Sequence, residues 1–231
     1  MRLIYNYAER CGFRVSNPVK HVAFYRETGR TRIVSLEEER AYLAGTSQPL
    51  RDIARIMLDT GMRPEEVFRI ETANLDFVQR TSLNPFGKTA AARRKLTMTD
   101  EVWLMLKART VSSKSPYVFS SPDKPEKPIG SVRKAHDAAV RRAKIVPGFR
   151  LYDLRHTYAS RAVMAGVDLP TLAALLGHTS VQMTMRYVHP AEEHKREAVA
   201  KIEKFKMAST IELAARSQGV TTKVTTVERA Q

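Results

Sequence analysis

The sequence Asp-Leu-Arg-His-Thr at residues 153–157 decides the interpretation of this chain, because two further motifs follow it at fixed distances. A Leu-Gly-His motif ends at His178, 23 residues after Arg155, and an Arg-Tyr-Val-His motif places Tyr187 9 residues after His178. An arginine, a histidine and a phenol are groups that can bind a phosphodiester and attack it. The three motifs together predict a site for such chemistry.

Two upstream motifs add a second arginine and a lysine. Thr-Gly-Met-Arg-Pro-Glu-Glu contains Arg63, and Phe-Gly-Lys-Thr contains Lys88. The five spaced motifs resemble those of the tyrosine recombinases, the phage-integrase family of site-specific DNA strand-exchange enzymes, over residues 32–205. The resemblance implies cleavage and rejoining of DNA strands through a 3′-phosphotyrosyl intermediate, for integration or excision of mobile DNA.

The composition favours a partner that carries many negative charges. The 231 residues include 39 Lys and Arg against 24 Asp and Glu, which gives a formal net charge of +15. Nucleic acid is the commonest polyanion for such a protein, although a merely soluble basic protein would show the same excess. A membrane surface fits less well, because no basic amphipathic helix carries a clean apolar face.

The single cysteine, Cys11, excludes a disulfide within the sequence and fits a reducing compartment. Residues 1–12 lack the apolar core of a signal peptide, and no apolar run approaches the roughly 20 residues of a membrane span. These features predict a cytoplasmic protein.

The periodicity of apolar residues predicts an α+β fold, a mainly helical domain with a small three-stranded antiparallel sheet. The resemblance implies that this is the catalytic domain. A turn at 87–92 within this sheet would carry Lys88. The strands are expected at 75–78, 81–86 and 94–99. The helices are expected at 2–11, 36–44, 50–59, 64–70, 100–109, 130–144, 154–165, 169–176 and 191–205, with a further short helix around Tyr187.

Local signals mark several of the expected helix starts. Ser35 and Glu38 form a capping box, and a second capping box at 179–182 is expected to open the short helix that follows. Asp153 and Asp168 are expected to be N-caps, because their side chains can accept hydrogen bonds from free backbone N–H groups.

Three segments are expected along the chain. Residues 1–31 look like the end of an N-terminal core-binding arm and its linker, since the family joins a helical core-binding domain to the catalytic domain. Residues 32–205 would form the catalytic domain, and 206–231 a C-terminal tail that could dock on a neighbouring protomer. Most of the first half of the family's DNA clamp is therefore expected to be missing from this chain.

Arg63 and Arg155 are the candidates for holding the phosphate. A guanidinium donates two parallel hydrogen bonds and stays charged, and each arginine is expected at a helix start, where free amides favour an anion. An isolated arginine is more often part of a surface ion pair, but the joint fit to the motifs favours phosphate binding. The resemblance implies that Glu66 orients these basic groups, and an ordinary helix-start glutamate is the alternative.

His178 is the expected hydrogen-bond donor to the phosphate. A histidine after Leu-Leu-Gly usually only caps a helix, but its spacing to the neighbouring motifs favours the functional role. His156, His178, His189 and His194 do not form a ligand set with cysteines or carboxylates at a recognisable spacing, so no metal and no cofactor are expected.

Tyr187 is the candidate nucleophile. A phenol with a pKa of about 10 is only about one part in a thousand ionised at neutral pH. Either neighbouring cations lower the pKa of Tyr187, or a base takes its proton during the attack. The resemblance gives Lys88 the role of the general acid that protonates the departing 5′-oxygen. Lys95 is the nearest competitor, but it is expected within a strand beside Arg93 and Arg94.

One position departs from the family pattern. Three residues before Arg155 the family has histidine or lysine, and this chain has Tyr152. A phenol can donate a hydrogen bond to a phosphate oxygen but is a poor proton acceptor near neutrality, which predicts weakened acid–base support. The alternative for Tyr152 is a packed aromatic side chain.

The resemblance implies double-stranded DNA and further copies of the chain as partners, in a tetrameric synapse, with accessory DNA-bending proteins as further candidates. DNA relaxation by a type IB topoisomerase-like enzyme is the nearest alternative function, because it uses the same chemistry. The other alternative is a DNA-binding module without catalysis, since residues 169–189 resemble a helix-turn-helix around Gly177. That interpretation leaves Arg63, Lys88 and Tyr187 unexplained.

Overall fold

The computed structural model describes residues 1–231 except 14–15, 24–31, 88, 189–195, 197–198 and 211–231. Contacts within the chain divide it into two units, Met1–Arg30 and Thr31–Gln231. All of the predicted site residues belong to the second unit, although Lys88 lies outside the described residues.

The first unit contains one described helix, α1 (Arg2–Arg10), whose apolar stripe is exposed. Leu3 and Tyr7 both lie on this stripe. The guanidinium of Arg2 donates a hydrogen bond to the carbonyl of Val19 at 2.9 Å, which ties the helix to the segment after it. The assignment of this unit to a core-binding arm stays a prediction.

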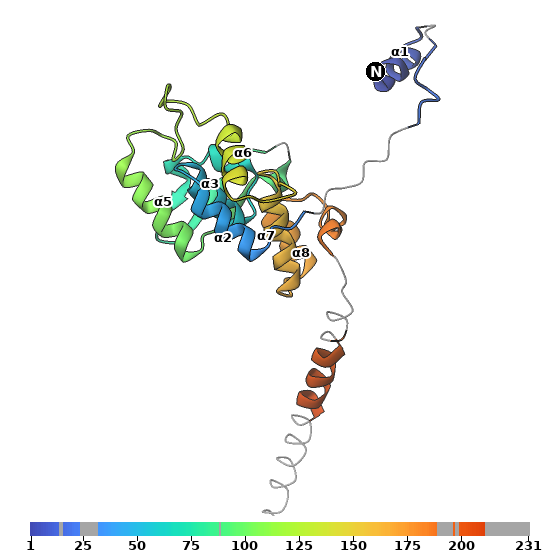
Figure 1. Ribbon diagram of the computed structural model, residues 1–231. Coiled ribbons are helices and arrows are strands. Elements are labelled where there is room, and N and C mark those ends of the chain that lie inside the picture. Colours follow the sequence, from blue (N-terminus) through green and yellow to red (C-terminus); the bar gives the residue numbers. More distant parts are fainter. Residues whose placement is uncertain (14–15, 24–31, 88, 189–195, 197–198, 211–231) are drawn as a thin grey trace, which may run out of the picture. The chain divides into compact units, whose positions relative to one another are not determined.

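Helix α3 (Leu50–Thr60) lies at the centre of the second unit (Figure 1). Its apolar residues recur at helical spacing, so one broad face of the helix is buried. Ile53, Ile56 and Met57 are fully buried on that face. The helix packs against α4 (Pro64–Phe68), α5 (Asp100–Ser112) and α7 (Asp153–Met164).

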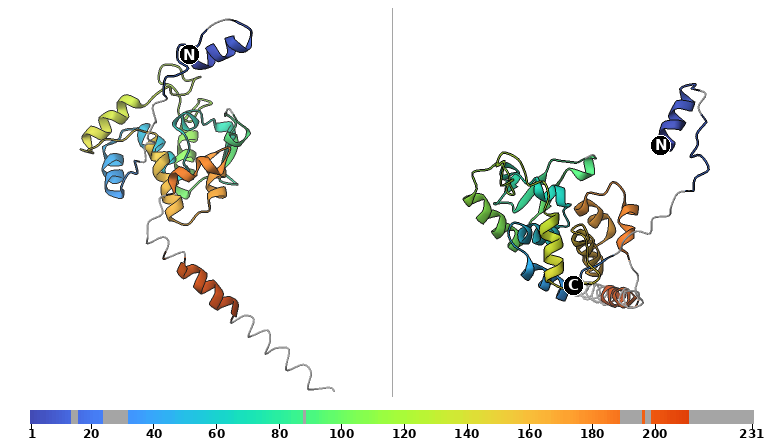
Figure 2. Two further views of the ribbon diagram at one scale, coloured as in Figure 1. Left: turned by 90° about the vertical axis from the view of Figure 1, so that its right-hand side faces the viewer. Right: turned by 45° about the horizontal axis from the view of Figure 1, so that its top comes forward.

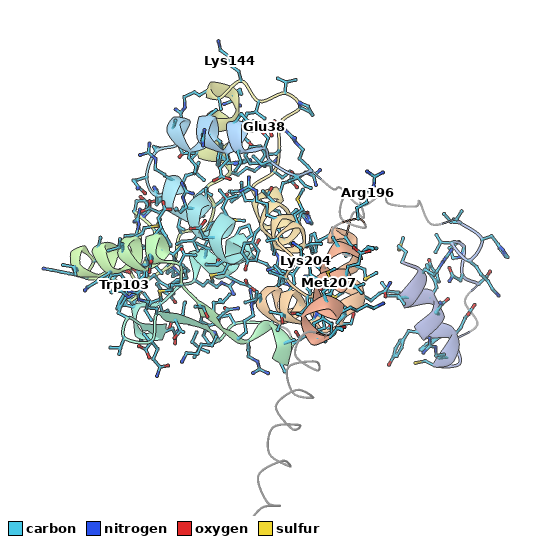
Figure 3. All side chains as sticks on the ribbon, turned by 90° about the horizontal axis from the view of Figure 1, so that it is seen from below. Glu38, Trp103, Lys144, Arg196, Lys204 and Met207 are labelled. Carbon is cyan, nitrogen blue, oxygen red and sulfur yellow. The ribbon has the colours of Figure 1, made fainter. Side chains whose placement is uncertain are left out.

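Helices α2 (Leu36–Gly45) and α6 (Arg133–Arg142) pack on each other. The predicted capping box of α2 is confirmed, because Ser35 Oγ accepts from the backbone N–H of Glu38 at 3.2 Å and the Glu38 carboxylate accepts from the backbone N–H of Ser35 at 2.9 Å. Figure 3 labels Glu38 on α2 and Lys144 just after α6.

Helix α6 begins three residues later than the predicted start at residue 130. Residues 130–132 are not helical, and Val132 is buried in the core at the point where the helix begins. Gly130 has a low helix propensity, and Ser131 Oγ accepts from the backbone N–H of Arg133 at 3.2 Å, so the helix begins only at Arg133.

A buried histidine joins α2 to α6. The Tyr42 hydroxyl donates to His136 Nδ1 at 2.7 Å, and His136 Nε2 donates to the carbonyl of Phe149 at 2.9 Å. Burial lowers the pKa of His136, so the ring is neutral and both of its nitrogens are satisfied.

The three predicted strands form the expected antiparallel sheet, in the order β1–β2–β3. Strand β1 (Leu75–Asp76) pairs with β2 (Thr81–Asn84), and β2 pairs with β3 (Arg94–Thr97). Asn84 lies opposite Arg94 in this pairing, so Arg94 is close to the turn that carries Lys88.

All three strands end earlier than predicted, and β3 ends at Thr97 instead of at residue 99. β2 ends at Asn84 because the next residue, Pro85, has no N–H to donate to the sheet. β1 ends at Asp76, whose carboxylate accepts hydrogen bonds from the backbone N–H groups of Val78 at 3.0 Å and Gln79 at 2.8 Å. An aspartate that binds the backbone ahead of it in this way favours a turn over a strand.

The predicted N-cap of α7 is wrong. Tyr152 occupies the cap position, and Asp153 is the first residue of the helix. The Asp153 carboxylate accepts from the backbone N–H of Arg150 at 2.8 Å and so closes the turn before the helix. Arg155 still falls in the first turn of α7, as expected.

Helix α8 (Leu169–Leu176) begins as predicted at Asp168, which accepts from the backbone N–H of Thr171 at 2.9 Å. Gly177 ends it with a φ of +66°. The capping box expected at 179–182 does not form, and two 3₁₀ turns stand where a helix was predicted: Val181–Met183 and Met185–Tyr187. The helix-turn-helix interpretation of this region is therefore wrong.

The described apolar side chains of the second unit form two clusters, here called the large core and the small core. The large core surrounds α3 and includes Leu154 at the start of α7. The small core lies where α7 and α8 pack side by side (Figures 1 and 2). It consists of Ala159, Leu172, Leu176 and Tyr187.

Trp103 on α5 packs at the edge of the large core and is labelled in Figure 3. Its indole Nε1 donates to the carbonyl of Phe77 at 2.9 Å. The ring is also contacted by two cations, with the Lys107 ammonium 4.7 Å and the Arg80 guanidinium 5.2 Å from its centre. The indole is thereby fixed between α5 and the turn after β1.

Residues 199–210 are helical, so the final helix continues to residue 210 instead of ending at 205. Its predicted start, and residues 211–231 of the predicted tail, lie outside the described residues. Within the described part of the chain, no helix combines the length and the apolar character that crossing a bilayer requires.

Candidate active site

Arg155 lies at the centre of the site and is fully buried. Its Nη1 donates to the carbonyl of Gly61 at 2.7 Å, and its Nη2 donates to the carbonyl of Leu176 at 2.6 Å. Nη2 also lies 3.2 Å from Nε2 of His178. One guanidinium thus joins the turn between α3 and α4 to the end of α8 and to the predicted histidine.

Two glycines allow these turns to approach the site closely. Both have a φ of +66°, a conformation that other residues rarely adopt. A Cβ at Gly61 would lie 2.4 Å from the Tyr158 ring, and a Cβ at Gly177 would lie 2.8 Å from Nη1 of Arg94. A side chain at either position would therefore push apart the elements that meet at Arg155.

The Nε of Arg155 is buried and has no hydrogen-bond partner in the described part of the chain. Burial, and then the positive charge of Arg63, lower the pKa of Arg155. A buried cation with an unsatisfied donor beside a second cation is costly in free energy, and a bound anion would offset that cost. This combination is typical of an anion-binding site.

Arg63 stands at the start of α4 and is held by Glu66. Its Nη1 donates to Glu66 Oε1 at 2.8 Å, and its backbone N–H donates to Glu66 Oε2 at 2.9 Å. Burial alone would lower the pKa of Arg63, but the hydrogen bond to Glu66 and the charge of that carboxylate raise it. The structure thus brings together the two residues predicted to act as a pair.

A third arginine, Arg94 on β3, completes this network and was not among the predicted site residues. Its Nη1 and Nη2 each lie 3.1 Å from one carboxylate oxygen of Glu66, and its Nε donates to the carbonyl of Leu175 at 2.7 Å. Burial alone would raise the pKa of Glu66, but Arg94 and Arg63 together lower it. Glu66 is therefore an ionised carboxylate shared by two arginines.

His178 is held between Arg155 and Thr184. Its Nε2 accepts from Arg155, so the proton lies on Nδ1, which donates to Thr184 Oγ1 at 2.8 Å. Burial, and then the charges of Arg155 and Arg63, lower the pKa of His178 to about 4. In the free protein Nε2 is therefore an acceptor and not the expected donor. A bound phosphate would offset the positive charges and favour protonation of this nitrogen.

Tyr187 lies at the end of the second 3₁₀ turn and is 5% exposed. Its ring is nearly parallel to that of His178, at 12° with centroids 6.1 Å apart, and the His156 ring lies 5.4 Å away. Burial raises the pKa of Tyr187, and the charge of Arg155 acts in the opposite direction without reversing the shift. In the free protein the cations therefore do not ionise Tyr187, which favours proton removal during the attack.

Tyr152 makes contacts that fit both of its interpretations. Its ring packs edge-to-face on His156, with centroids 5.1 Å apart at 70°. Its phenol also contributes to the raised pKa of Arg63, although less than Glu66 does. Tyr152 is 37% exposed, so it is not a core residue.

The neighbours of Lys88 line a cleft beside Arg63. The cleft has a volume of about 610 Å³, and Gly87 and Thr89 lie on its wall together with Arg63. The competitor Lys95 is exposed and donates to the side chain of Gln79 at 2.6 Å. Adjacent residues of a strand point to opposite faces, so Lys95 points away from the face on which Arg94 meets Glu66.

Among the described residues, no group of His, Cys, Asp and Glu side chains could hold a metal ion. His189 and His194 lie outside the described residues.

The fold and the site define a class of protein: a helical domain with a small antiparallel sheet, in which Arg63, Arg155, His178 and Tyr187 lie close together. Residues 32–194 match the phage integrase family, and the chain belongs to this family. The expected α+β fold is confirmed by its solved relatives.

Individual relatives agree with this placement. The integrase of Salmonella phage P22 is 28% identical over 186 residues, which cover 75% of this chain and 48% of the relative. A tyrosine recombinase of Thermosipho africanus is 26% identical, with 86% of this chain and 71% of the relative covered. The chain therefore spans about half the length of the phage P22 relative.

The solved structures that resemble the fold include two integrases. The Tn1549 transposon integrase in complex with transposon right end DNA superimposes with a TM-score of 0.71 at 19% identity, covering 88% of this chain and 76% of that one. The catalytic domain of bacteriophage HP1 integrase gives a TM-score of 0.54 at 26% identity, covering 73% of this chain and 93% of that domain.

Proposed function

We propose that this chain is the catalytic part of a site-specific DNA recombinase that cleaves and rejoins strands through a 3′-phosphotyrosyl intermediate, for integration or excision of mobile DNA. Its membership of the phage integrase family and its relatives named integrase and tyrosine recombinase support the proposal. DNA relaxation and DNA binding without catalysis are not favoured by these relatives.

The observation that carries the proposal is the position of Arg155. Its buried guanidinium touches the turn before Arg63 and the His178 ring, and its Nε is left without a partner in the described structure. The Tyr187 ring is nearly parallel to that of His178 and packs in the small core with residues of α7 and α8. A phosphodiester bound to the two arginines would therefore meet a phenol oxygen within one chain.

The chemistry follows from these positions. The Tyr187 hydroxyl gives up its proton to water as its oxygen attacks the phosphorus and forms a phosphoester bond, while the bond from phosphorus to the 5′-oxygen breaks. Arg63 and Arg155 stabilise the negative charge that develops on the non-bridging oxygens, and His178 binds one of them when Nε2 is protonated. Lys88 gives its proton to the departing 5′-oxygen. Because the phosphoester bond energy is kept, a 5′-hydroxyl can reverse the reaction without ATP.

The proposed partners are duplex DNA and further copies of the chain. A solved relative is a lambda integrase dimer bound to a core site, which supports both partners. We extend this to a tetrameric synapse, to accessory DNA-bending proteins and to action in the cytoplasm. Duplex binding by this chain alone is expected to be weak and steeply salt-dependent, because a catalytic domain contacts mainly phosphates.

The test is the formation of a covalent adduct with DNA. The chain is incubated with short duplexes of randomised central sequence, each nicked so that the cleaved oligonucleotide diffuses away and rejoining is blocked. We expect an adduct that survives denaturing electrophoresis, and sequencing of its DNA would define the target site.

Tyr187→Phe is the control for this experiment, because it removes one oxygen and keeps the ring that packs on His178. We expect no adduct from this variant and nearly unchanged duplex affinity. An adduct that persists in Tyr187→Phe would exclude Tyr187 as the nucleophile, and the absence of any adduct with the unmodified chain would contradict the proposed reaction.

A further inference from the structure

We infer that Arg94 is a positioning residue of this site, which holds Glu66 and the end of α8 in place and keeps Glu66 from cancelling the charge of Arg63. The inference rests on the proposed function, since it concerns how the same phosphate site is assembled.

Arg94 is nearly buried, and its guanidinium is fixed by hydrogen bonds to Glu66 and to two backbone carbonyls. Its side chain is 8% exposed, as is that of Glu66, so the pair is shielded from water. Nη1 and Nη2 take one carboxylate oxygen each at 3.1 Å, which is the two-pronged geometry that only a guanidinium provides. Nε donates to Leu175 at 2.7 Å, and Nη1 also donates to Ala92 at 3.2 Å.

These bonds connect three parts of the site that are distant in sequence. Arg94 belongs to β3, directly after the turn that carries Lys88, while Glu66 belongs to the helix that starts at Arg63. Leu175 is in the last turn of α8, three residues before His178. A change at Arg94 therefore acts on Arg63 through Glu66 and on His178 through the end of α8. Arg94 itself does not have to touch the DNA.

The close approach of Gly177 gives independent support for this arrangement. A Cβ at Gly177 would lie 2.8 Å from Nη1 of Arg94. The turn that leads to His178 is thus built directly against the Arg94 guanidinium, and the glycine is needed to make room for it.

The charges explain why a second arginine is needed on Glu66. With Arg63 alone, the carboxylate would pair one-to-one with the guanidinium that is meant to attract the phosphate. Arg94 supplies a second positive charge, so the set of Arg63, Glu66 and Arg94 stays net positive while Glu66 still orients Arg63. An exposed ion pair would have little effect, but this one is buried.

The experiment compares Arg94→Met, Arg94→Lys and the control Arg93→Met, using the adduct-forming duplex pool. Arg93 is the adjacent residue, is exposed, and carries the same charge. We expect Arg94→Met to slow adduct formation at saturating protein concentration by about 10- to 100-fold, with duplex affinity changed less than about threefold. This is less than the about 10²- to 10³-fold loss expected for a group that itself binds the reacting phosphate, because Arg94 acts through other residues. Arg94→Lys should be intermediate, because it keeps the charge and loses the fork. Arg93→Met should behave like the unmodified chain.

A double variant separates positioning from a general loss of structure. In Arg94→Met the unopposed Glu66 charge cancels that of Arg63, so adding Glu66→Gln should make adduct formation faster than in Arg94→Met alone, a non-additive result. A merely structural Arg94 predicts a double variant that is as slow or slower. That outcome, or normal adduct formation by Arg94→Met, would overturn the inference.

Inorganic phosphate provides a readout that does not depend on cleavage. We expect it to shift the His178 ring resonances of the unmodified chain in NMR spectra, and to do so only at higher concentration in Arg94→Met. If the unmodified chain forms no adduct, the proposed function fails, and this titration alone decides the role of Arg94. An equal phosphate response in both proteins would then reject the positioning role.

Discussion

The large core and the small core of the second unit hold the chain together in different ways. The large core is a hydrocarbon interior around α3, in which the buried His136 is neutral and satisfied by Tyr42 and Phe149. The small core has four buried members, one of which is Tyr187, and it borders the buried cation Arg155. The first arrangement provides most of the apolar burial, while the second holds reactive groups against backbone carbonyls.

This difference indicates that stability and activity depend on separate places in the same unit. Removing hydrocarbon from the large core should unfold the chain without changing the chemistry of molecules that remain folded. Removing groups at the small core should change the chemistry first.

Arg155→Lys should lower the rate of adduct formation by about 10²- to 10³-fold. An ammonium cannot reach the carbonyls of Gly61 and Leu176 and a phosphate at the same time, so the site loses donors that stabilise developing charge. The rate of single-turnover cleavage, measured at a protein concentration that saturates the DNA, tests this expectation. Arg141→Lys, an exposed position on α6, serves as the matched control, and near-normal cleavage by Arg155→Lys would mean that the phosphate ligand is misassigned.

Ile53→Ala and Leu172→Ala are a matched pair, one in each core, and both side chains are fully buried. Each should lower the free energy of unfolding by about 2–5 kcal/mol, as measured by urea denaturation. Only Leu172→Ala should also slow adduct formation under conditions where both variants are folded, because it opens a cavity next to Tyr187. Equal slowing by both would show that the two cores are not separate.

Tyr152→His should keep or raise the rate of adduct formation, by severalfold at most. The change restores the residue type usual in the family, and the raised pKa of Arg63 already includes an effect of the Tyr152 phenol. Cleavage rates and a melting curve measured on the same sample distinguish the interpretations. A loss of folding would instead support the packed-aromatic role on His156.

The two buried histidines should respond differently to an anion. Burial lowers the pKa of both His136 and His178. Below the ordinary histidine pKa of 6.5, the unfolded chain therefore takes up protons that the folded chain does not, and the free energy of unfolding falls as the pH drops. For His178 this fall continues towards its folded-state pKa of about 4. Inorganic phosphate should raise the pKa of His178, because it offsets Arg155 and Arg63, and should leave His136 unchanged. Ring NMR titrations with and without phosphate measure both, and equal shifts would contradict a site confined to the small core.

Much of the fold could be predicted because its signals are local. The capping box at Ser35, the N-cap at Asp168 and the glycine at 177 each act through backbone groups a few residues away, and these ends agree with the structure. The failures also have local causes that compete with the predicted signal, such as Asp153, whose carboxylate closes the preceding turn instead of capping the helix. The 3₁₀ turns around Thr184 wrap a side chain that is bonded to His178, which helical periodicity does not reveal.

The site residues were predicted from the spacing of motifs. Arg94 was missed because no local pattern marks it. Arg94 stands between Arg93 and Lys95 and reads as one member of a solvent-exposed basic run. Its burial depends on Glu66, 28 residues earlier, and on Leu175, 81 residues later. Contacts at such separations are set by the packing of β3 against α8, so the sequence alone did not distinguish Arg94 from its neighbours.

Trp103 has a practical consequence for every measurement of folding. It is the one tryptophan of the sequence, and it is anchored to the Phe77 carbonyl at the edge of the large core. Tryptophan fluorescence, excited selectively at the long-wavelength end of protein absorption, will therefore report the unfolding of the large core. It will be insensitive to changes in packing around Tyr187. A variant that has lost the packing around Tyr187 will show an unchanged tryptophan melting transition. A thermal-shift screen based on intrinsic fluorescence would therefore classify that variant as folded.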